Sequence, residues 1–136
     1  MATLKTNTLT GTSTAGSIAV TGEGNSTTTN LQQGLLKFWY NLKGDSTASI
    51  RDSLNTGSLT DNGTGDYSIT FTNNMANNDY YYGTTQRANS FTAGVATESD
   101  LETSKIDNTL TYDATGSNVD RDIQGCLLYT SDAADE

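Results

Sequence analysis

The sequence predicts an all-β fold, an antiparallel β-sandwich of short strands. Apolar and polar residues alternate in several short runs, the segments between these runs are rich in glycine and asparagine, and periodic helical patterns are hard to find. The 136 residues are a usual length for one domain. Thr, Ser, Asn and Gly supply 64 of these residues and only 33% of the chain is hydrophobic, so we expect a small core.

Residues 1–34 are expected to form a low-complexity arm or linker. Thr, Ser, Gly and Asn dominate this segment, which buries too little apolar surface to fold alone. Its one apolar cluster, residues 18–20, could add a short strand. Residues 35–125 are then the expected sandwich domain.

The densest apolar stretch, residues 35–43, is predicted to be a half-buried strand. One of its faces is wholly apolar or aromatic and carries Leu36, Phe38, Tyr40 and Leu42. Trp39 lies on the opposite, mixed face. This indole is expected either to pack on a neighbouring subunit or to fill the second layer of the sandwich.

Residues 47–55 fit two kinds of element. Ile50 and Leu54 are spaced four residues apart, which suits a short helix, but they also share one face of a strand. The β-rich surroundings favour the strand.

The clearest turn signal is Asn62-Gly63, followed by a second glycine at position 65, which is typical of a β-hairpin. The strict alternation over residues 67–72 predicts a strand with three inward side chains, Tyr67, Ile69 and Phe71. The oxygen-rich loop 61–66 also resembles a calcium ligand set, but the hairpin turn explains it without a metal. We therefore expect no metal site.

Three further strands are predicted after the polar connection 73–79. The first begins at Tyr80 and runs toward Gln86, and the second covers residues 91–96 with an interruption at Gly94. The third lies within residues 103–113 and has one solvated face.

Three adjacent tyrosines, Tyr80, Tyr81 and Tyr82, are candidate contact residues together with Trp39. Side chains alternate across a strand, so at least one of the tyrosines should point outward. Exposed Tyr and Trp make good contact surfaces because they bury a large area at low entropic cost. They would then contact a glycan, a receptor or another subunit. The alternative places Tyr80 and Tyr82 in the core and Tyr81 at the surface without a role.

Composition excludes several function classes. Without His, and with a single Cys, the chain has no ligand set for a usual zinc site and no Ser-His-Asp or Cys-His nucleophile. The net charge of -9 disfavours a nucleic-acid surface, and no apolar run approaches the length of a membrane span. The N-terminus has no apolar signal segment, which predicts assembly in a cytoplasm.

An enzyme is not expected, and no cofactor is expected either. The acidic clusters are Asp61 with Asp66, and Glu98 with Asp100 and Glu102. A glycosidase needs two carboxyls that flank a sugar in a cleft. These clusters lie in predicted loops, so the sequence shows no sign of such a cleft.

Five segments together resemble a module of structural and tail-fibre proteins of marine bacteriophages. They are residues 16–24, 33–42, 50–55, 60–71 and 79–82, and the match is strongest at 60–71 (Thr-Asp-Asn-Gly-Thr-Gly-Asp-Tyr-Ser-Ile-Thr-Phe). The resemblance covers residues 15–85. Members usually have Ala-Trp-Val where this chain has Phe38-Trp39-Tyr40, and a proline before the tyrosine strand that this chain lacks.

The resemblance implies a β-rich virion component at the distal part of a fibre, assembled as a homotrimer in the host cytoplasm with other virion proteins. Such a subunit acts by assembly and by binding a glycan or protein of the host surface. A homotrimer would also explain the small apolar content, because partner chains could complete the core. Two alternatives stay open: a free-standing carbohydrate-binding module and a capsid decoration protein.

The last eleven residues, 126–136, resemble a translated adapter of transposase-based sequencing libraries, residue for residue. Cys126 stands at the junction, where the composition changes abruptly. We expect this tail to be non-native, the authentic fragment to end near Gly125, and the native C-terminal sequence to be missing.

Overall fold

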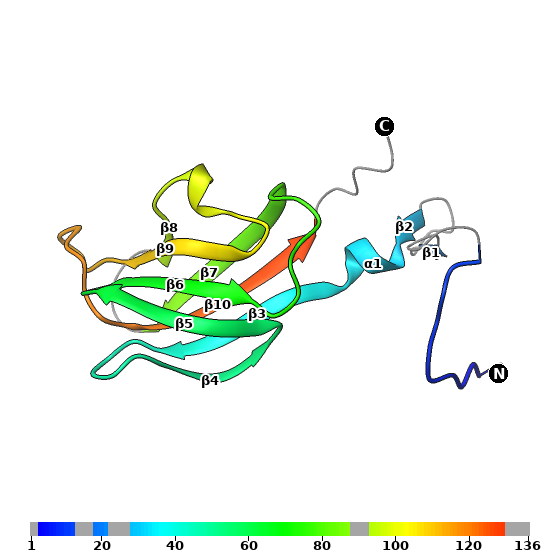
Figure 1. Ribbon diagram of the computed structural model, residues 1–136, viewed down its shortest axis with the longest axis horizontal. Helices are drawn as coiled ribbons and strands as arrows, with labels where there is room; N and C mark the ends of the chain where they lie inside the picture. Colours follow the sequence, from blue (N-terminus) through cyan, green and yellow to red (C-terminus); the bar gives the residue numbers. More distant parts are fainter. Residues whose placement is uncertain (1–2, 13–17, 22–27, 88–92, 130–136) are drawn as a thin grey trace. The chain divides into compact units, whose positions relative to one another are not determined.

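The computed structural model describes residues 3–12, 18–21, 28–87 and 93–129. Residues 36–129 contain two antiparallel four-stranded sheets, which confirms the all-β sandwich class predicted from the sequence (Figure 1). The first sheet has the order β4–β3–β10–β7, with β3 at Leu36–Lys43, β4 at Ser49–Leu54, β7 at Tyr80–Arg87 and β10 at Asp122–Tyr129. The second has the order β5–β6–β9–β8, with β5 at Thr56–Gly63, β6 at Asp66–Phe71, β8 at Ala93–Val95 and β9 at Lys105–Thr111.

The core lies between the two sheets. Its side chains come from alternate positions of the strands, as a sandwich requires. Across the two layers, the rings of Phe38 and Phe71 meet edge to face with centroids 4.9 Å apart. The buried apolar residues are Phe38, Tyr40, Leu42, Tyr67, Ile69, Phe71, Met75, Tyr80, Ile106, Ile123 and Leu127. The predicted inward faces of residues 36–42 and 67–71 are therefore confirmed, except that Leu36 is 40% exposed.

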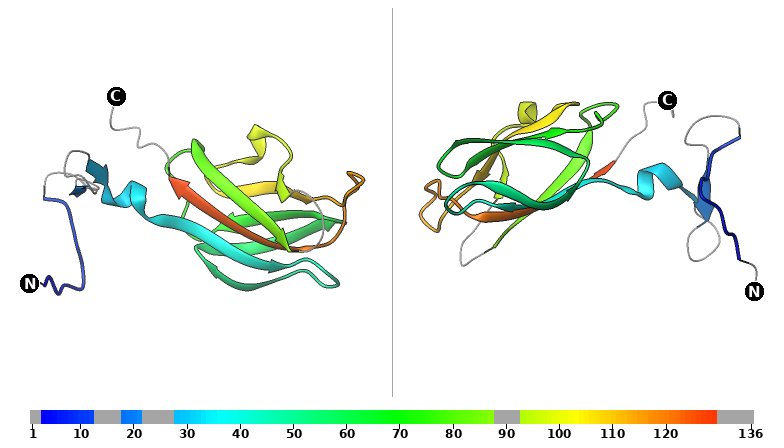
Figure 2. Two further views of the ribbon diagram at one scale, coloured as in Figure 1. Left: turned by 180° about the vertical axis from the view of Figure 1, so that it is seen from behind. Right: turned by 60° about the horizontal axis from the view of Figure 1, so that its bottom comes forward.

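Strand β10 is the centre of the first sheet, between β3 and β7 (Figure 2). Gly125 stands opposite Tyr40 on β3, and the Tyr40 ring occupies the space where a side chain at position 125 would be. A Cβ on Gly125 would lie 2.4 Å from Tyr40 Cε1. The Tyr40 hydroxyl then meets the Tyr82 hydroxyl at 2.5 Å, so that one ring bridges three strands of the sheet.

The chain crosses from the first sheet to the second at Asn55, between β4 and β5. Asn55 has a φ of 62°, in the left-handed region where asparagine is better tolerated than most residues. Its side-chain Oδ1 accepts a hydrogen bond from the Asn73 amide at 2.7 Å, and its Nδ2 donates to the Asn73 carbonyl at 2.9 Å. The strand preference for residues 47–55 is confirmed, and Asn55 ends that strand.

The predicted hairpin is confirmed as the β5–β6 connection, but its turn is Thr64-Gly65, and Asn62-Gly63 forms the end of β5. At its turn, the Gly65 amide donates to Asp120 Oδ1 at 2.7 Å. The buried Tyr67 hydroxyl donates to the Gly44 carbonyl at 3.1 Å and to the same Asp120 oxygen at 3.2 Å. These bonds connect the turns at one end of both sheets.

Strand β9, within the predicted segment 103–113, contains a bulge that the sequence pattern did not indicate. Tyr67 pairs with Thr109 and Ile69 pairs with Ile106, so β9 holds one extra residue between these two pairs. Asn108, in the bulge, has a φ of 42°. Because of the extra residue, Ile106 and Thr109 both face the core although they are three residues apart.

Residues 1–35 form a separate unit. Its β1 (Ala19–Thr21) pairs with β2 (Thr28–Asn30), and one helical turn, α1 (Leu31–Gly34), follows. The short strand expected at residues 18–20 is thus present, in a two-stranded sheet of its own. The apolar side chains of Leu4, Leu9 and Val20 are all exposed.

The adapter-like segment begins inside β10. Cys126 pairs with Trp39 and with Gly83, and Leu127 pairs with Phe38 and Tyr82. Leu127 is 0% exposed, so it fills part of the core. The strand therefore continues past the expected boundary at residue 125, because Cys126 and Leu127 keep the alternation of outward and inward side chains. Residues 130–136 lie outside the described part.

We expect Gly125→Ala to lower the free energy of unfolding by about 1–3 kcal/mol, because a methyl group there overlaps the buried Tyr40 ring. Gly83→Ala is the matched control on β7. Its new Cβ would lie 3.1 Å from Cε1 of the exposed Tyr81 ring, which can rotate away. Urea unfolding of both variants measures the difference. Equal losses would contradict the proposed contact.

A second prediction concerns position 127. We expect an independent genomic copy of this gene to depart from the present sequence after Gly125 but to keep a large apolar residue at position 127. The core requires one there, between Phe38 and Tyr82. Sequencing across the junction decides this. An intact 126–136 segment in that copy, or a polar residue at position 127, would refute the expectation.

Candidate functional site

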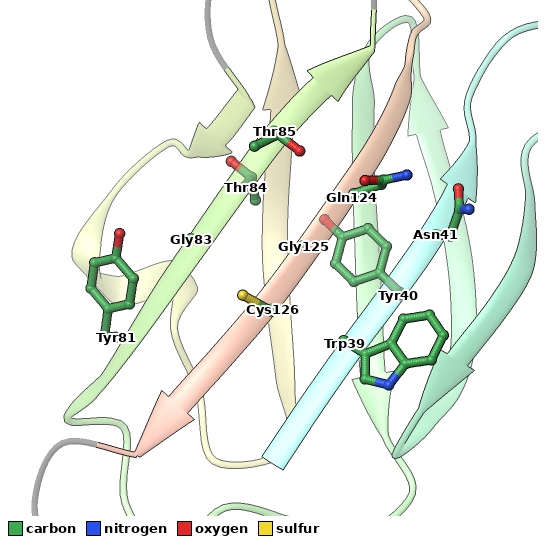
Figure 3. A pocket seen from close by; sticks show the side chains of 10 residues that line it. All are labelled: Trp39, Tyr40, Asn41, Tyr81, Gly83, Thr84, Thr85, Gln124, Gly125 and Cys126. Carbon is green, nitrogen blue, oxygen red and sulfur yellow. The ribbon is translucent and has the colours of Figure 1, made fainter. Parts of the chain in front are cut away.

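An open hollow of about 550 Å³ lies on the outer face of the first sheet, across β3, β10 and β7 (Figure 3). Ligand pockets commonly have volumes of about 300–1,000 Å³. The hollow brings together two of the residues that the sequence singled out, Trp39 and Tyr81.

The pairing of the three strands explains why the sheet is hollowed here. Cys126 on β10 pairs with Trp39 on β3 and with Gly83 on β7. In this row across the sheet, Trp39 has a large side chain, Cys126 a small one and Gly83 none. Residues paired in this way point to the same face of the sheet. Gly83 adds no side chain of its own to the floor, and the Tyr81 ring leans over its backbone.

Trp39 and Tyr81 stand at opposite sides of this floor (Figure 3). Trp39 is half-buried, whereas Tyr81 is 61% exposed. The Tyr81 ring leans along β7 toward Gly83, with its Cε1 and hydroxyl 3.1 and 3.3 Å from the place of a Cβ at Gly83. An aromatic ring over a strand glycine covers the backbone that the glycine exposes.

The next row of the sheet is polar and consists of Asn41, Gln124 and Thr85. Arg51 on β4 donates from Nη1 to Asn41 Oδ1 at 3.3 Å. The same guanidinium forms an ion pair with Asp122 at 2.7 Å. This pair joins β4 to β10 across β3 and balances the arginine charge beside the hollow.

The Asp122 carboxyl is ionised at neutral pH. Its partial burial raises its pKa, but hydrogen bonds from Arg51 and from the Gly44 amide outweigh this effect and hold the pKa below its usual value. The ion pair with Arg51 is therefore present at neutral pH and joins β4 to β10.

The other two tyrosines do not reach the hollow. Tyr80 is 6% exposed and donates a hydrogen bond to the Glu102 carbonyl at 2.9 Å. Tyr82 packs against the core with its hydroxyl beside Tyr40. Burial raises the pKa of Tyr82 to about 12 and that of Tyr40 well above its usual value. Of the two arrangements considered from the sequence, the structure has the one with Tyr80 and Tyr82 in the core and Tyr81 at the surface.

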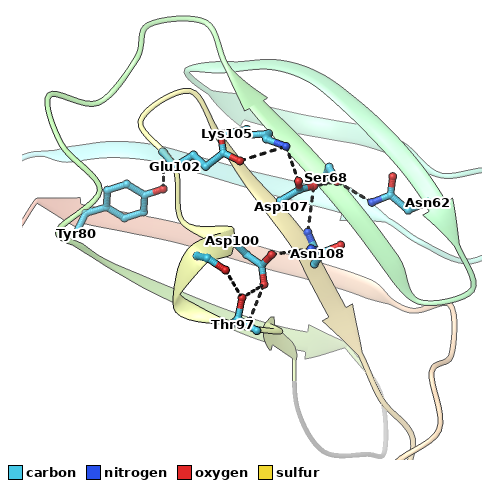
Figure 4. Close-up of polar contacts among 10 residues, drawn as sticks. Asn62, Ser68, Tyr80, Thr97, Asp100, Glu102, Lys105, Asp107 and Asn108 are labelled. Carbon is cyan, nitrogen blue, oxygen red and sulfur yellow. Dashed lines mark hydrogen bonds and ion pairs between the residues drawn. The ribbon is translucent and has the colours of Figure 1, made fainter.

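A second polar cluster surrounds the bulge of β9 (Figure 4). Asp107 accepts short hydrogen bonds from Ser68 and Lys105, and Lys105 also pairs with Glu102 at 3.3 Å. Asn62 donates to Ser68 Oγ at 2.6 Å, which ties the β5–β6 hairpin to this cluster. The hydrogen bonds from Lys105 and Ser68 hold the pKa of Asp107 below its usual value.

Asp100 closes the same cluster at the end of the short helix η1 (Glu98–Asp100). Its carboxylate accepts hydrogen bonds from Asn108 Nδ2 at 2.6 Å and from the Thr97 amide at 2.6 Å. Burial raises the pKa of Asp100, but these hydrogen bonds outweigh it and lower the pKa overall. A general acid of a glycosidase needs a raised pKa, so these bonds suit a structural carboxylate.

Residues 61–66 form the tip of the β5–β6 hairpin, with the turn at Thr64-Gly65. Asp61 Oδ1 accepts a hydrogen bond from the Gly63 amide at 3.1 Å, and Asp66 Oδ1 accepts one from Asn62 at 3.3 Å. The described residues contain no group of three or more His, Cys, Asp or Glu side chains placed to hold a metal ion. Within the same ranges, no helix is long and apolar enough to cross a membrane.

Sequence reasoning placed Trp39 on the mixed face of its strand but missed Gly83, Thr85 and Gln124 as parts of a site. These three come from β7 and β10, far from Trp39 in the sequence. Only the pairing of the strands brings them together. The alternation of side chains after Tyr81 was the one available signal, since it places Gly83 and Thr85 on the same face as Tyr81.

No family model, no curated protein and no solved structure matches this chain.

We expect the free energy of unfolding to be highest between about pH 5 and 9 and to fall on both sides. Asp100, Asp107 and Asp122 have lowered pKa values in the folded chain. Their stabilisation is present above the unfolded pKa near ~3.9 and is lost as the pH falls through the folded value. Tyr40 and Tyr82 have raised pKa values in the folded chain, so above ~10, the usual pKa of tyrosine, they lose their protons more readily in the unfolded chain. The free energy of unfolding therefore falls as the pH rises above this value.

Urea unfolding at a series of pH values measures this profile. Asp107→Asn should lower stability at pH 7 and make the acid side of the profile shallower, because one carboxyl with a lowered pKa is gone. Glu98→Gln is the control, since it removes an exposed carboxyl of η1 and leaves the Asp107 hydrogen bonds in place. An acid side as steep in Asp107→Asn as in Glu98→Gln would contradict the assignment.

Proposed function

We propose that this chain is a subunit of a phage virion appendage of the tail-fibre kind, which acts by assembly and by attachment to the host surface. Residues 60–71 carry this proposal, because there the resemblance to virion proteins of marine phages is strongest. In the structure these residues form most of the β5–β6 hairpin, which supplies Tyr67, Ile69 and Phe71 to the core.

The hollow on the first sheet supports the attachment part of the proposal. A subunit that attaches by surface contact needs aromatic side chains held at the surface by a rigid scaffold. Trp39 and Tyr81 meet this requirement, since both stand on paired strands rather than on loops. The arm 1–34 would lead toward the rest of the virion.

A free-standing carbohydrate-binding module is the second candidate function. The observation that favours it is the same hollow, in which two aromatic side chains stand beside amide and hydroxyl groups. A capsid decoration protein is the third candidate function. The oligomeric state and the position in the virion distinguish the three.

We expect the purified chain to be a homotrimer and to copurify with phage tails. Light scattering of the intact protein measures the first, and fractionation of particles that carry the gene into heads and tails measures the second. A trimer in the tail fraction supports the fibre subunit. A stable monomer would refute the assembly proposal in favour of the binding module, and copurification with heads would favour the decoration protein.

A further inference from the structure

We propose that the hollow between Trp39 and Tyr81 binds a neutral glycan of the host surface. This inference rests on the proposed attachment function and names the ligand chemistry of the same face. Three features of the hollow support this inference: its lining has no charged side chain, it has two aromatic rings, and it offers hydrogen-bonding groups.

The lining of the hollow carries no charge. The chain as a whole has 23 charged side chains, counting Lys, Arg, Asp and Glu together, yet none of the residues that line the hollow is one of them. Arg51, which donates a hydrogen bond to Asn41 of the lining, forms an ion pair with Asp122 at 2.7 Å, so its charge is balanced. Since an uncharged site gains nothing from an ionised ligand and would have to desolvate it, the ligand is expected to be neutral.

The aromatic side chains are placed to receive flat apolar faces. Trp39 stands on β3 and Tyr81 on β7, with β10 between them. Neighbouring strands lie ~4.8 Å apart, so the two rings flank a floor about two strand spacings wide. A pyranose ring fits this width, and its C–H face packs against an aromatic side chain while its hydroxyls stay at the edge. The sugar would lie between the two rings over the small side chain of Cys126, with the Tyr81 ring standing over Gly83.

The polar row supplies groups that match sugar hydroxyls. Arg51 donates its hydrogen bond to Asn41 Oδ1, so this contact does not use the N–H groups of Asn41 Nδ2. The side chains of Gln124 and Thr85 are exposed and make no hydrogen bond with another described residue. An amide and a hydroxyl can each donate and accept, as the vicinal hydroxyls of a sugar also do. This complementarity favours a glycan over an apolar peptide.

The first measurement is binding of the full chain to an array of neutral glucose, galactose and N-acetylglucosamine oligosaccharides, printed with uronic-acid and sialic-acid oligosaccharides. We expect binding to neutral members, with a preference over the acidic ones. Lys37 lies on the same face of β3 as Trp39 but outside the lining. The acidic oligosaccharides therefore test whether the positive charge of Lys37, rather than the hollow, determines which glycan binds. Signal confined to acidic members, or to none, would overturn the proposal.

The second measurement compares variants on the neutral oligosaccharide that binds best. We expect Trp39→Ala and Tyr81→Ala each to weaken binding about tenfold or more, because aromatic contacts usually dominate such sites. Thr85→Ala should weaken it less. Thr60→Ala, an exposed threonine of β5 in the other sheet, is the matched control and should bind like the parent chain.

Light scattering of the same variants separates the outcomes. If Trp39→Ala dissociates the oligomer, the face is an interface between copies of this chain and the glycan proposal is wrong. A trimer that binds no neutral glycan refutes this inference and leaves the fibre proposal standing. A monomer whose glycan binding depends on Trp39 supports the inference and refutes the fibre proposal. Unchanged binding by folded Trp39→Ala and Tyr81→Ala would place any glycan elsewhere.

Discussion

The packing of the Tyr40 ring against Gly125 fixes the first sheet. Strand β10 can lie beside β3 only if position 125 has no side chain, because the ring already fills that volume at 2.4 Å from where a Cβ would stand. With β10 held in this register, the Tyr40 hydroxyl reaches Tyr82 on β7. The order of the sheet and the inner surface of the sandwich therefore both depend on one aromatic–glycine contact.

The two faces of this sheet use glycine in different ways. On the inner face, Gly125 makes room for a ring that comes from the neighbouring strand, and the space is filled. On the outer face, the Tyr81 ring leans over Gly83, and the hollow stays open between this ring and Trp39. Because adjacent strands carry these two glycines, the same short stretch of sheet is tightly packed inside and accessible outside.

Much of the fold could be predicted from the sequence, because alternation and turn chemistry are local signals. The strand at residues 67–71 and the β5–β6 hairpin were predicted in this way, although the turn lies at Thr64-Gly65 rather than at Asn62-Gly63. The β9 bulge could not be, since Asn108 adopts its left-handed conformation within a ladder to β6 and with a bond to Asp100. Within the site, Trp39 and Tyr81 were identifiable as aromatic residues on strands. Their partners Gln124 and Thr85 become neighbours only through long-range pairing.

The central position of β10 also has a kinetic consequence. Until this strand emerges from the ribosome, β3 and β7 have no partner on the sides that it later covers, and β3 exposes its apolar face. Such unpaired edges are templates for association with other chains. A topology of this high contact order folds in milliseconds to seconds rather than microseconds. The nascent chain thus passes through a stage in which its largest sheet is two separated halves, and chaperone binding would be most useful at that stage.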